Sequence, residues 1–166
     1  MVKIKQLIVL FSFFLCLGYT AMGQNVQVIK YPALEKMFKQ SKDTVLIVNF
    51  WATWCKPCIE ELPYFENISK KYEGTKVKVV LINLDVVKDL TTKVKPFVGK
   101  NNIRSSDIYL LDEPDYNSWI DKVSADWSGS LPFTLIVGSD NKIRKTFEEP
   151  LTESQLEKEI QPFIKL

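Results

Sequence analysis

Histidine is absent from this sequence of 166 residues, and cysteine occurs only three times. Without an imidazole there is no base for a Ser-His or Cys-His pair, so both classes of nucleophilic hydrolase are excluded. The scarcity of cysteine also argues against a small domain that is held together by several disulfides. Any chemistry in this chain must therefore use other proton carriers than histidine.

Long hydrophobic runs are also scarce, and the longest lies near the N-terminus. Residues 1–23 combine two lysines, an apolar run from Leu7 to Leu17, and small residues at Ala21 and Gly23. This order is typical of a secretory signal peptide, and we predict cleavage before Gln24. The run is shorter than the ~20 residues of a membrane-spanning helix. An uncleaved N-terminal membrane anchor is the alternative.

The predicted mature chain, residues 24–166, has no excess of charge. Removal of Lys3 and Lys5 leaves 20 of the 22 basic residues, against 20 acidic residues. Interspersed charges without an excess give no electrostatic reason to expect binding to nucleic acid or to an anionic bilayer. Cys16 would leave with the signal peptide, and its bulky neighbours do not favour a lipid-attachment site. Export would place the domain where disulfides persist.

The two remaining cysteines, Cys55 and Cys58, lie three residues apart in the stretch WCKPC. Two thiols at this spacing can be joined and parted reversibly. A purely structural disulfide would close a very short loop and stabilise little. A zinc half-site would lack two ligands, because the mature chain has no histidine and no further cysteine. We predict a redox-active dithiol/disulfide that uses no metal and no cofactor.

Hydrophobic periodicity predicts one α/β domain. Nearly continuous apolar runs at Thr44–Trp51 and Lys76–Leu84 are typical of buried strands. Apolar residues every three to four positions from 55 to 73 predict a helix that begins at the cysteine pair and ends near Gly74. The other expected elements are strands at 25–29, 108–111, 133–137 and 142–147, and helices from Pro32, around 90–98, at 115–123 and after Thr152. They predict a mixed central sheet with helices on both faces.

The helix start gives the two thiols different roles. Unpaired backbone N–H groups and the helix dipole stabilise a thiolate at Cys55, and Lys56 adds a positive charge. Pro57 occupies an early helical position that needs no N–H. Cys58, one turn further in, should hold its proton more firmly. We expect Cys55 to attack a substrate disulfide and Cys58 to resolve the mixed disulfide, and the same steps in reverse to oxidise a dithiol.

Glu61 is the candidate proton acceptor for Cys58. It follows Cys58 by three residues and shares its helix face, whereas Glu60 points elsewhere. A carboxylate there could take the proton through a water molecule. The alternative is that both glutamates are ordinary solvated helix residues.

The segment FWATWCKPC at residues 50–58, Pro63 in the helix and Pro132 before a later strand resemble the thioredoxin superfamily. The resemblance implies a cis peptide bond between Leu131 and Pro132, packed opposite the disulfide, with the backbone just before Pro132 pairing with substrate. It also implies that Trp54 shields the Cys55 side of the site. Trp51 we expect to pack in the core, and Trp127 either to line the substrate groove or to pack under its loop.

Asn49, the sequence Glu61-Leu62-Pro63 and the extra segment at about residues 84–127 are similar to the extracytoplasmic TlpA/ResA branch of that superfamily. Asn49 stands where cytosolic thioredoxins carry a buried aspartate that is thought to serve the resolving cysteine. The TlpA/ResA branch shares this replacement and has a glutamate that matches Glu61. The resemblance therefore implies a proton-handling role for Glu61, in agreement with its position on the helix.

By this resemblance the chain is a periplasmic or otherwise extracytoplasmic thiol:disulfide oxidoreductase that acts on cysteine-containing proteins. Apocytochrome c thiols and other exported thiols are the implied targets, and a membrane thiol protein the implied electron donor. Lys56-Pro57 favours a reductase, since strong oxidants carry a histidine there. The alternatives are a disulfide oxidase or isomerase on the same fold, or a non-catalytic binding module or metallochaperone. A peroxidase is disfavoured because Thr53-Trp54-Cys55 lacks the Thr-x-x-Cys spacing of peroxiredoxins.

Overall fold

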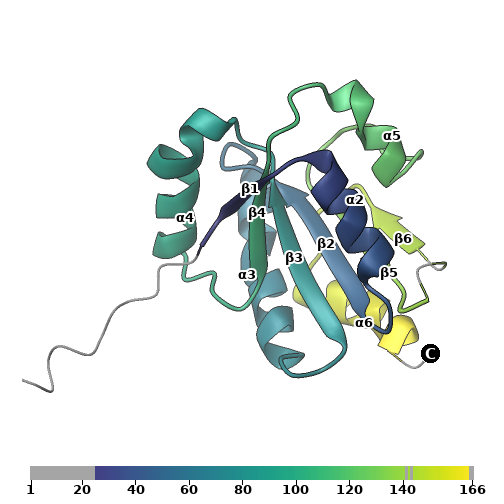
Figure 1. Ribbon diagram of the computed structural model, residues 1–166. Helices are drawn as coiled ribbons and strands as arrows, with labels where there is room; N and C mark the ends of the chain where they lie inside the picture. Colours follow the sequence, from purple (N-terminus) through teal and green to yellow (C-terminus); the bar gives the residue numbers. More distant parts are fainter. Residues whose placement is uncertain (1–24, 141, 143, 165–166) are drawn as a thin grey trace, which may run out of the picture.

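The computed structural model of the chain describes residues 25–140, 142 and 144–164. The predicted signal peptide at 1–23, the cleavage site before Gln24 and Cys16 lie outside the described residues. Within the described part, a central mixed sheet of six strands separates two layers of helices (Figure 1). This arrangement confirms the predicted α/β fold with a covered sheet.

The helices and strands follow the predicted order, with short 3-10 and π-helical turns in addition. The elements are β1 (Gln27–Ile29), α2 (Tyr31–Gln40), β2 (Val45–Trp51), α3 (Lys56–Lys71), β3 (Val77–Asn83), η1 (Val87–Asp89), η2 (Leu90–Val94), α4 (Lys95–Lys100), β4 (Asp107–Leu111), η3 (Tyr116–Ser118), α5 (Ile120–Val123), β5 (Phe133–Val137), β6 (Arg144–Phe147) and α6 (Glu153–Ile164).

The sheet has the strand order β1-β4-β3-β2-β5-β6. The first four strands in that order run parallel to their neighbours, while β5 lies antiparallel to β2 and β6 antiparallel to β5. Because helices cover both faces of the sheet at β2, its residues are buried on both sides, which explains its continuous apolar sequence. The strand that leads to the cysteine pair is thus held on both sides.

Alternate residues of β2 belong to two separate cores. Val45, Ile47 and Trp51 pack with α3 and α6 on one face, whereas Leu46, Val48 and Phe50 pack with α2 on the other. Asn49 lies on the α3 side of the strand, where the other β2 side chains are apolar. The period of two along the strand therefore points a single polar side chain toward the helix that carries the cysteines.

The prediction of one continuous α-helix around residues 90–98 is wrong. The chain instead forms the 3-10 turn η1, the π-helical turn η2 and only then the short helix α4, whose first turn contains Pro96. Pro96 has no N–H to donate to the carbonyl four residues earlier, so a regular α-helix cannot run through this point without a lost hydrogen bond. The apolar spacing gave the buried face correctly, since Val94 and Val98 are buried.

The predicted helix at 115–123 is likewise divided, into η3 and α5, at Trp119. This residue has a φ of −138°, outside the helical range. Its indole is buried and donates from Nε1 to the carbonyl of Glu113 at 3.2 Å. Burial of the large ring against Phe50 and Trp127 accounts for the break in the helix.

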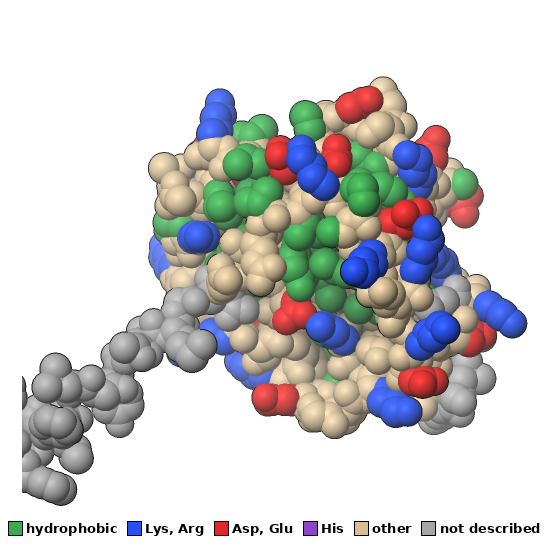
Figure 2. Space-filling model, in the orientation of Figure 1, with side chains coloured by type: hydrophobic (Ala, Val, Ile, Leu, Met, Phe, Trp, Pro, Cys, Tyr) green, Lys and Arg blue, Asp and Glu red, His purple; other side chains and the backbone are tan. Residues whose placement is uncertain are grey.

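Basic and acidic side chains are interspersed on the face seen in Figure 2, with apolar side chains gathered near the centre of that face. This agrees with the nearly even count of charges in the sequence. None of the helices within the described residues is both long and apolar enough to cross a bilayer.

Candidate active site

Cys55 and Cys58 form a disulfide at the start of α3. Cys55 is the N-cap residue of the helix, and its Sγ accepts a hydrogen bond from the Cys58 N–H at 3.4 Å. Cys55 is 6% exposed and Cys58 is fully buried. Both cysteines are thus buried, and Cys55 keeps the larger exposed fraction of the two.

The residues next to the cysteine pair differ in how far their side chains are exposed to solvent. Pro57 lies in the first turn of α3, as predicted. Lys56 extends into solvent, and its ammonium group lies 3.9 Å from the carboxylate of Glu60, with both side chains mostly exposed. Trp54 is 68% exposed. Beside the disulfide, the surface thus combines a large exposed indole with a solvated cation.

Glu61 is buried, with 1% of its surface exposed. Its carboxylate accepts a hydrogen bond from Asn49 Nδ2 at 2.7 Å and one from the backbone N–H of Leu151 at 2.8 Å. Desolvation by burial raises the pKa of Glu61 to about 7, although these two hydrogen bonds oppose the rise. The interpretation of Glu61 as a solvated helix residue is wrong, because its side chain points into the protein, whereas that of Glu60 is exposed.

Asn49 links the helix to two strands. Its Nδ2 donates to Glu61 and also to Thr134 Oγ1, at 3.1 Å, on the neighbouring strand β5. Within the described residues the Oδ1 of Asn49 has no hydrogen-bond partner, although it is buried. Thr134 and Leu151 were missed by the sequence interpretation, because no local pattern connects Thr134 to Asn49, 85 positions away, or Leu151 to Glu61, 90 positions away.

The peptide bond between Leu131 and Pro132 is cis, as the resemblance implies. Leu131 packs against the core cluster that contains both cysteines. The preceding loop is anchored by Glu148, whose carboxylate accepts from the N–H groups of Ser128 and Ser130, both at 3.1 Å. Leu131 and Pro132 thus follow a loop whose backbone is held in place by the Glu148 carboxylate.

Two tryptophans pack in the cores. Trp51 is fully buried, and its ring centroid lies 5.4 Å from that of Phe97. Trp127 stacks on Phe133, with ring centroids 4.2 Å apart, and donates from Nε1 to the carbonyl of Ser130 at 2.9 Å. Of the two positions considered for Trp127, packing under its loop is the one observed.

Asp85 is a further polar residue at this end of the sheet that the sequence interpretation missed. It is buried, and it accepts hydrogen bonds from both the N–H and the hydroxyl of Thr53, two residues before Cys55. A signal was available in the sequence. Asn83 ends a buried parallel strand and Asp85 follows it, and the carboxyl ends of neighbouring parallel strands meet at one edge of a sheet.

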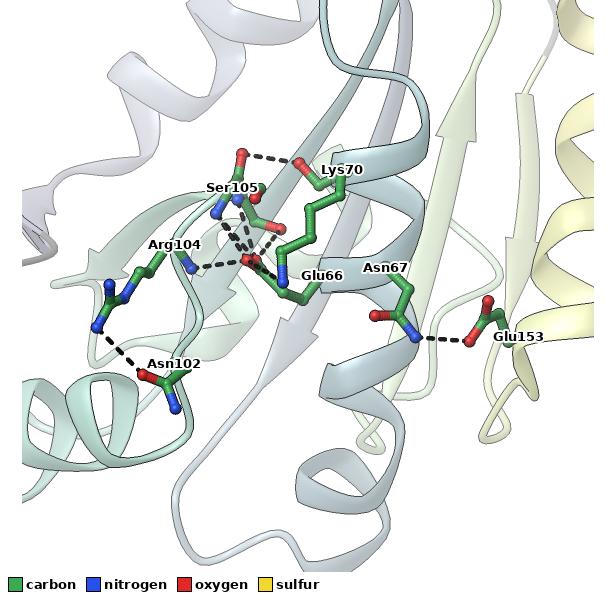
Figure 3. A network of polar contacts seen from close by, with 9 residues as sticks. Glu66, Asn67, Lys70, Asn102, Arg104, Ser105 and Glu153 are labelled. Carbon is green, nitrogen blue, oxygen red and sulfur yellow. Dashed lines mark hydrogen bonds and ion pairs between the residues drawn. The ribbon is translucent and has the colours of Figure 1, made fainter.

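Glu66 is the other buried carboxylate of α3, and it too was missed. It accepts from the backbone N–H groups of Arg104, Ser105 and Ser106 at 2.9, 2.8 and 3.3 Å (Figure 3). Desolvation raises the pKa of Glu66, but these hydrogen bonds outweigh it, so the pKa lies below its usual value. Glu66 therefore holds the loop before β4 as a charged carboxylate.

No group of three or more histidine, cysteine, aspartate or glutamate side chains within the described part of the chain is arranged to hold a metal ion.

The sequence matches the Redoxin family over residues 32–160. The thiol-disulfide oxidoreductase ResA of Bacillus cereus is 28% identical over 120 residues, which cover 72% of this chain and 63% of ResA. The thioredoxin-like protein YneN of Bacillus subtilis is 30% identical over 125 residues, covering 74% of this chain and 66% of YneN. The aligned part of the chain thus spans slightly less than two thirds of the length of these relatives.

A crystal structure of a thioredoxin-related protein from Neisseria meningitidis serogroup B has the same fold. It superposes with a TM-score of 0.64 at 26% identity, and the match covers 77% of this chain and 90% of that chain. The predicted thioredoxin fold is confirmed by this similarity.

Proposed function

Because the chain belongs to the Redoxin family and is a TlpA/ResA-like member of the thioredoxin superfamily, we propose that it is an exported thiol:disulfide oxidoreductase. It exchanges the Cys55–Cys58 disulfide with cysteine-containing protein substrates. The observation that carries the proposal is the disulfide at the N-terminus of α3, in which Cys55 is the N-cap residue and the less buried of the two cysteines.

Reduction of a substrate proceeds in two exchanges. The Cys55 thiolate attacks one sulfur of the substrate disulfide, that bond breaks, and the other substrate sulfur leaves as a thiolate while a mixed disulfide forms. Cys58 then loses its proton and attacks the Cys55 sulfur, which restores the Cys55–Cys58 disulfide and releases the second substrate thiolate. Two electrons pass from the enzyme to the substrate, and a thiol donor must supply two electrons to reduce the enzyme again.

Glu61 is the proposed proton acceptor for Cys58. A pKa of about 7 leaves its carboxyl group partly ionised near neutral pH, so it can both take up and return a proton. Its placement on the same face of α3 as Cys58, three residues further on, supports this role. Asn49 holds the carboxylate at its Oε1 and thereby fixes its orientation.

The backbone at Leu131, before the cis bond to Pro132, is the proposed pairing site for the substrate chain. The pairing of β5 with β2 begins only at Phe133, so Leu131 lies beyond the register of that ladder. Trp54 supplies an exposed aromatic surface next to Cys55. An extended substrate segment laid across the Cys55 sulfur would lie between these two residues.

We further propose that the enzyme acts outside the cytoplasm as a reductase. The predicted signal peptide at residues 1–23 supports export, and Lys56-Pro57 between the cysteines supports the direction of transfer. Apocytochrome c thiols or other exported cysteines are the proposed targets, with a membrane thiol protein as electron donor. A reduction potential of the Cys55/Cys58 couple above roughly −150 mV would instead place the protein among the oxidants.

The proposal is tested by reduction of insulin with dithiothreitol as electron source. The wild-type chain should accelerate the reaction, and Cys55→Ser should abolish the acceleration. Cys58→Ser should accumulate mixed disulfides through Cys55, because the resolving thiol is missing. A wild-type protein that does not exchange with insulin or with exported proteins, and a Cys58→Ser variant that traps none, would refute the function.

A further inference from the structure

A buried carboxylate outside the cysteine pair is tied to the turn that leads into α3. Asp85 is 3% exposed. Its oxygens accept from Thr53 N–H at 2.8 Å, from Thr53 Oγ1 at 2.6 Å and from Asn83 Nδ2 at 2.7 Å. Its own N–H donates to Asn83 Oδ1 at 3.1 Å. A carboxylate withdrawn from water is costly unless its oxygens are paired, and here each oxygen has a donor.

The turn in question comprises Ala52, Thr53 and Trp54, between β2 and Cys55. Its ends are held by the backbone, because Leu84 N–H donates to Trp51 O at 2.8 Å and Cys55 N–H donates to Ala52 O at 3.1 Å. Thr53, in the middle, is held by Asp85 through both its N–H and its hydroxyl. Without Asp85, two polar groups of Thr53 would lose their partner.

We propose that Asp85 is a positioning residue for Cys55, an inference that rests on the proposed exchange function. By fixing Thr53, the carboxylate fixes the backbone that enters α3 two residues later. Cys55 Sγ then stays at the helix N-terminus when the disulfide opens, where unpaired N–H groups stabilise its thiolate. We call the hydrogen bonds from Thr53 to the Asp85 carboxylate the clamp. It acts through geometry, since the Asp85 oxygens are directed at Thr53 and Asn83.

If Asp85 acted only through its charge, removing it would have the opposite effect on ionisation of the Cys55 thiol. A negative charge near Cys55 disfavours its thiolate, so removal of the charge alone would ease ionisation of the thiol. Asp85→Asn removes the charge but keeps one oxygen for Thr53 N–H and an amide that can donate to Thr53 Oγ1. Asp85→Ala removes both the charge and the clamp. The two variants therefore separate position from charge.

The experiment uses the purified mature chain and two readouts. One is the pH profile of alkylation of Cys55 by iodoacetamide in the reduced protein. The other is the equilibrium between the Cys55–Cys58 disulfide and dithiothreitol. For Asp85→Ala we expect the alkylation midpoint to move upward, and the equilibrium to move ~fivefold toward the disulfide, the scale of one lost hydrogen bond. Asp85→Asn should restore both readouts to near the wild-type values.

Thr53→Val provides a second variant that preserves the shape of the side chain and removes only its hydroxyl. We expect it to shift both readouts in the same direction as Asp85→Ala, by a smaller factor. Asp89→Asn is the matched control, because the carboxylate of Asp89 pairs with Lys93 at 2.9 Å and lies in η1 beyond the clamp. It should behave as wild type.

A folded Asp85→Ala variant with wild-type alkylation and equilibrium would overturn the proposal, and so would an Asp85→Asn variant that shifts as far as Asp85→Ala. If circular dichroism shows Asp85→Ala to be unfolded, Thr53→Val decides, and wild-type values for it refute the clamp. The dithiothreitol equilibrium is measurable whether or not insulin is a substrate. Failure of the exchange function is thus distinguishable from failure of the clamp.

Discussion

Helix α3 carries two buried glutamates five residues apart, and their pKa values move in opposite directions. Burial raises the pKa of Glu61 to about 7. The pKa of Glu66 is also raised by desolvation, but hydrogen bonds from the backbone of Arg104, Ser105 and Ser106 lower it by more. Two carboxylates on one helix thus differ in charge near neutral pH.

The difference lies in what faces each carboxylate. Glu61 faces one side-chain amide and one backbone N–H. Glu66 is wrapped by three consecutive backbone N–H groups and the hydroxyl of Ser106, as the network in Figure 3 shows in part. Burial alone therefore does not predict the ionisation of a carboxylate. The number of donors directed at it decides whether it remains charged or holds a proton.

The largest expected effect comes from removing the more heavily bonded carboxylate. Glu66→Ala leaves three backbone N–H groups without their acceptor, and we expect it to lower the free energy of unfolding by about 3–5 kcal/mol. Denaturant titration at pH 7 measures this. Glu60→Ala on the exposed face of the same helix is the control and should change stability by less than about 0.5 kcal/mol. Equal losses in the two variants would contradict the comparison.

The next effect concerns chemistry at the other glutamate. In Glu61→Gln, release of the Cys58 proton loses its proposed acceptor, and we expect resolution of the mixed disulfide to slow on the order of 100-fold. Stopped-flow measurements from pH 5 to 9 should show a wild-type rate that rises with a midpoint near the Glu61 pKa of about 7. The variant should lose this midpoint, and Glu60→Gln should keep it. An unchanged midpoint in Glu61→Gln would remove Glu61 from the mechanism.

The same substitution should raise stability at alkaline pH. The folded state keeps the Glu61 proton up to about pH 7, whereas an unperturbed glutamate releases it near 4.5. Between these values unfolding releases a proton, so the stability that the protonated Glu61 contributes is lost as the pH rises. We expect Glu61→Gln to be more stable than wild type by roughly 2 kcal/mol at pH 8, and equally or less stable at pH 4. Thermal unfolding at both pH values measures the difference.

The smallest effect is expected from the cation beside Glu66. Lys70 Nζ lies 3.6 Å from the Glu66 carboxylate, but the lysine side chain is 56% exposed. Exposed ion pairs contribute little, so Lys70→Ala should lower stability by about 0.5 kcal/mol or less. Denaturant titration of Lys70→Ala and of Glu66→Ala measures the ratio of the two losses in stability. A loss in Lys70→Ala close to that of Glu66→Ala would assign the low pKa of Glu66 to the ion pair instead of the backbone donors.

Elements with a clear local pattern were predicted correctly from the sequence. The continuous apolar run of β2 and the apolar spacing of α3 gave a buried strand that leads to a helix starting at the cysteines. The helix expected after Thr152 is α6, and at its start the Thr152 N–H donates to Gln155 Oε1 at 2.9 Å, as in a capping box. Each of these depends on neighbours within a few residues, which the sequence displays directly.

Contacts between distant segments were not predicted. Glu61 contacts Leu151 and Glu66 contacts the loop at 104–106, with no local pattern that couples the partners. Asp85 contacts Thr53 because the two follow neighbouring parallel strands, a signal that was not used. The division of the chain at 87–100 into three short helical pieces was missed although Pro96 signals it, because the apolar spacing alone favoured one helix.

The sequence by itself determined the cysteine pair and its place at a helix N-terminus, because these follow from spacing and helix geometry over a single turn. Only the tertiary structure decided which glutamate holds a proton near neutral pH. That decision depends on donors 12 and 90 residues away for Glu61 and 38 to 40 residues away for Glu66. The number of donors that reach each glutamate is fixed only when the sheet, α3 and the loops pack together.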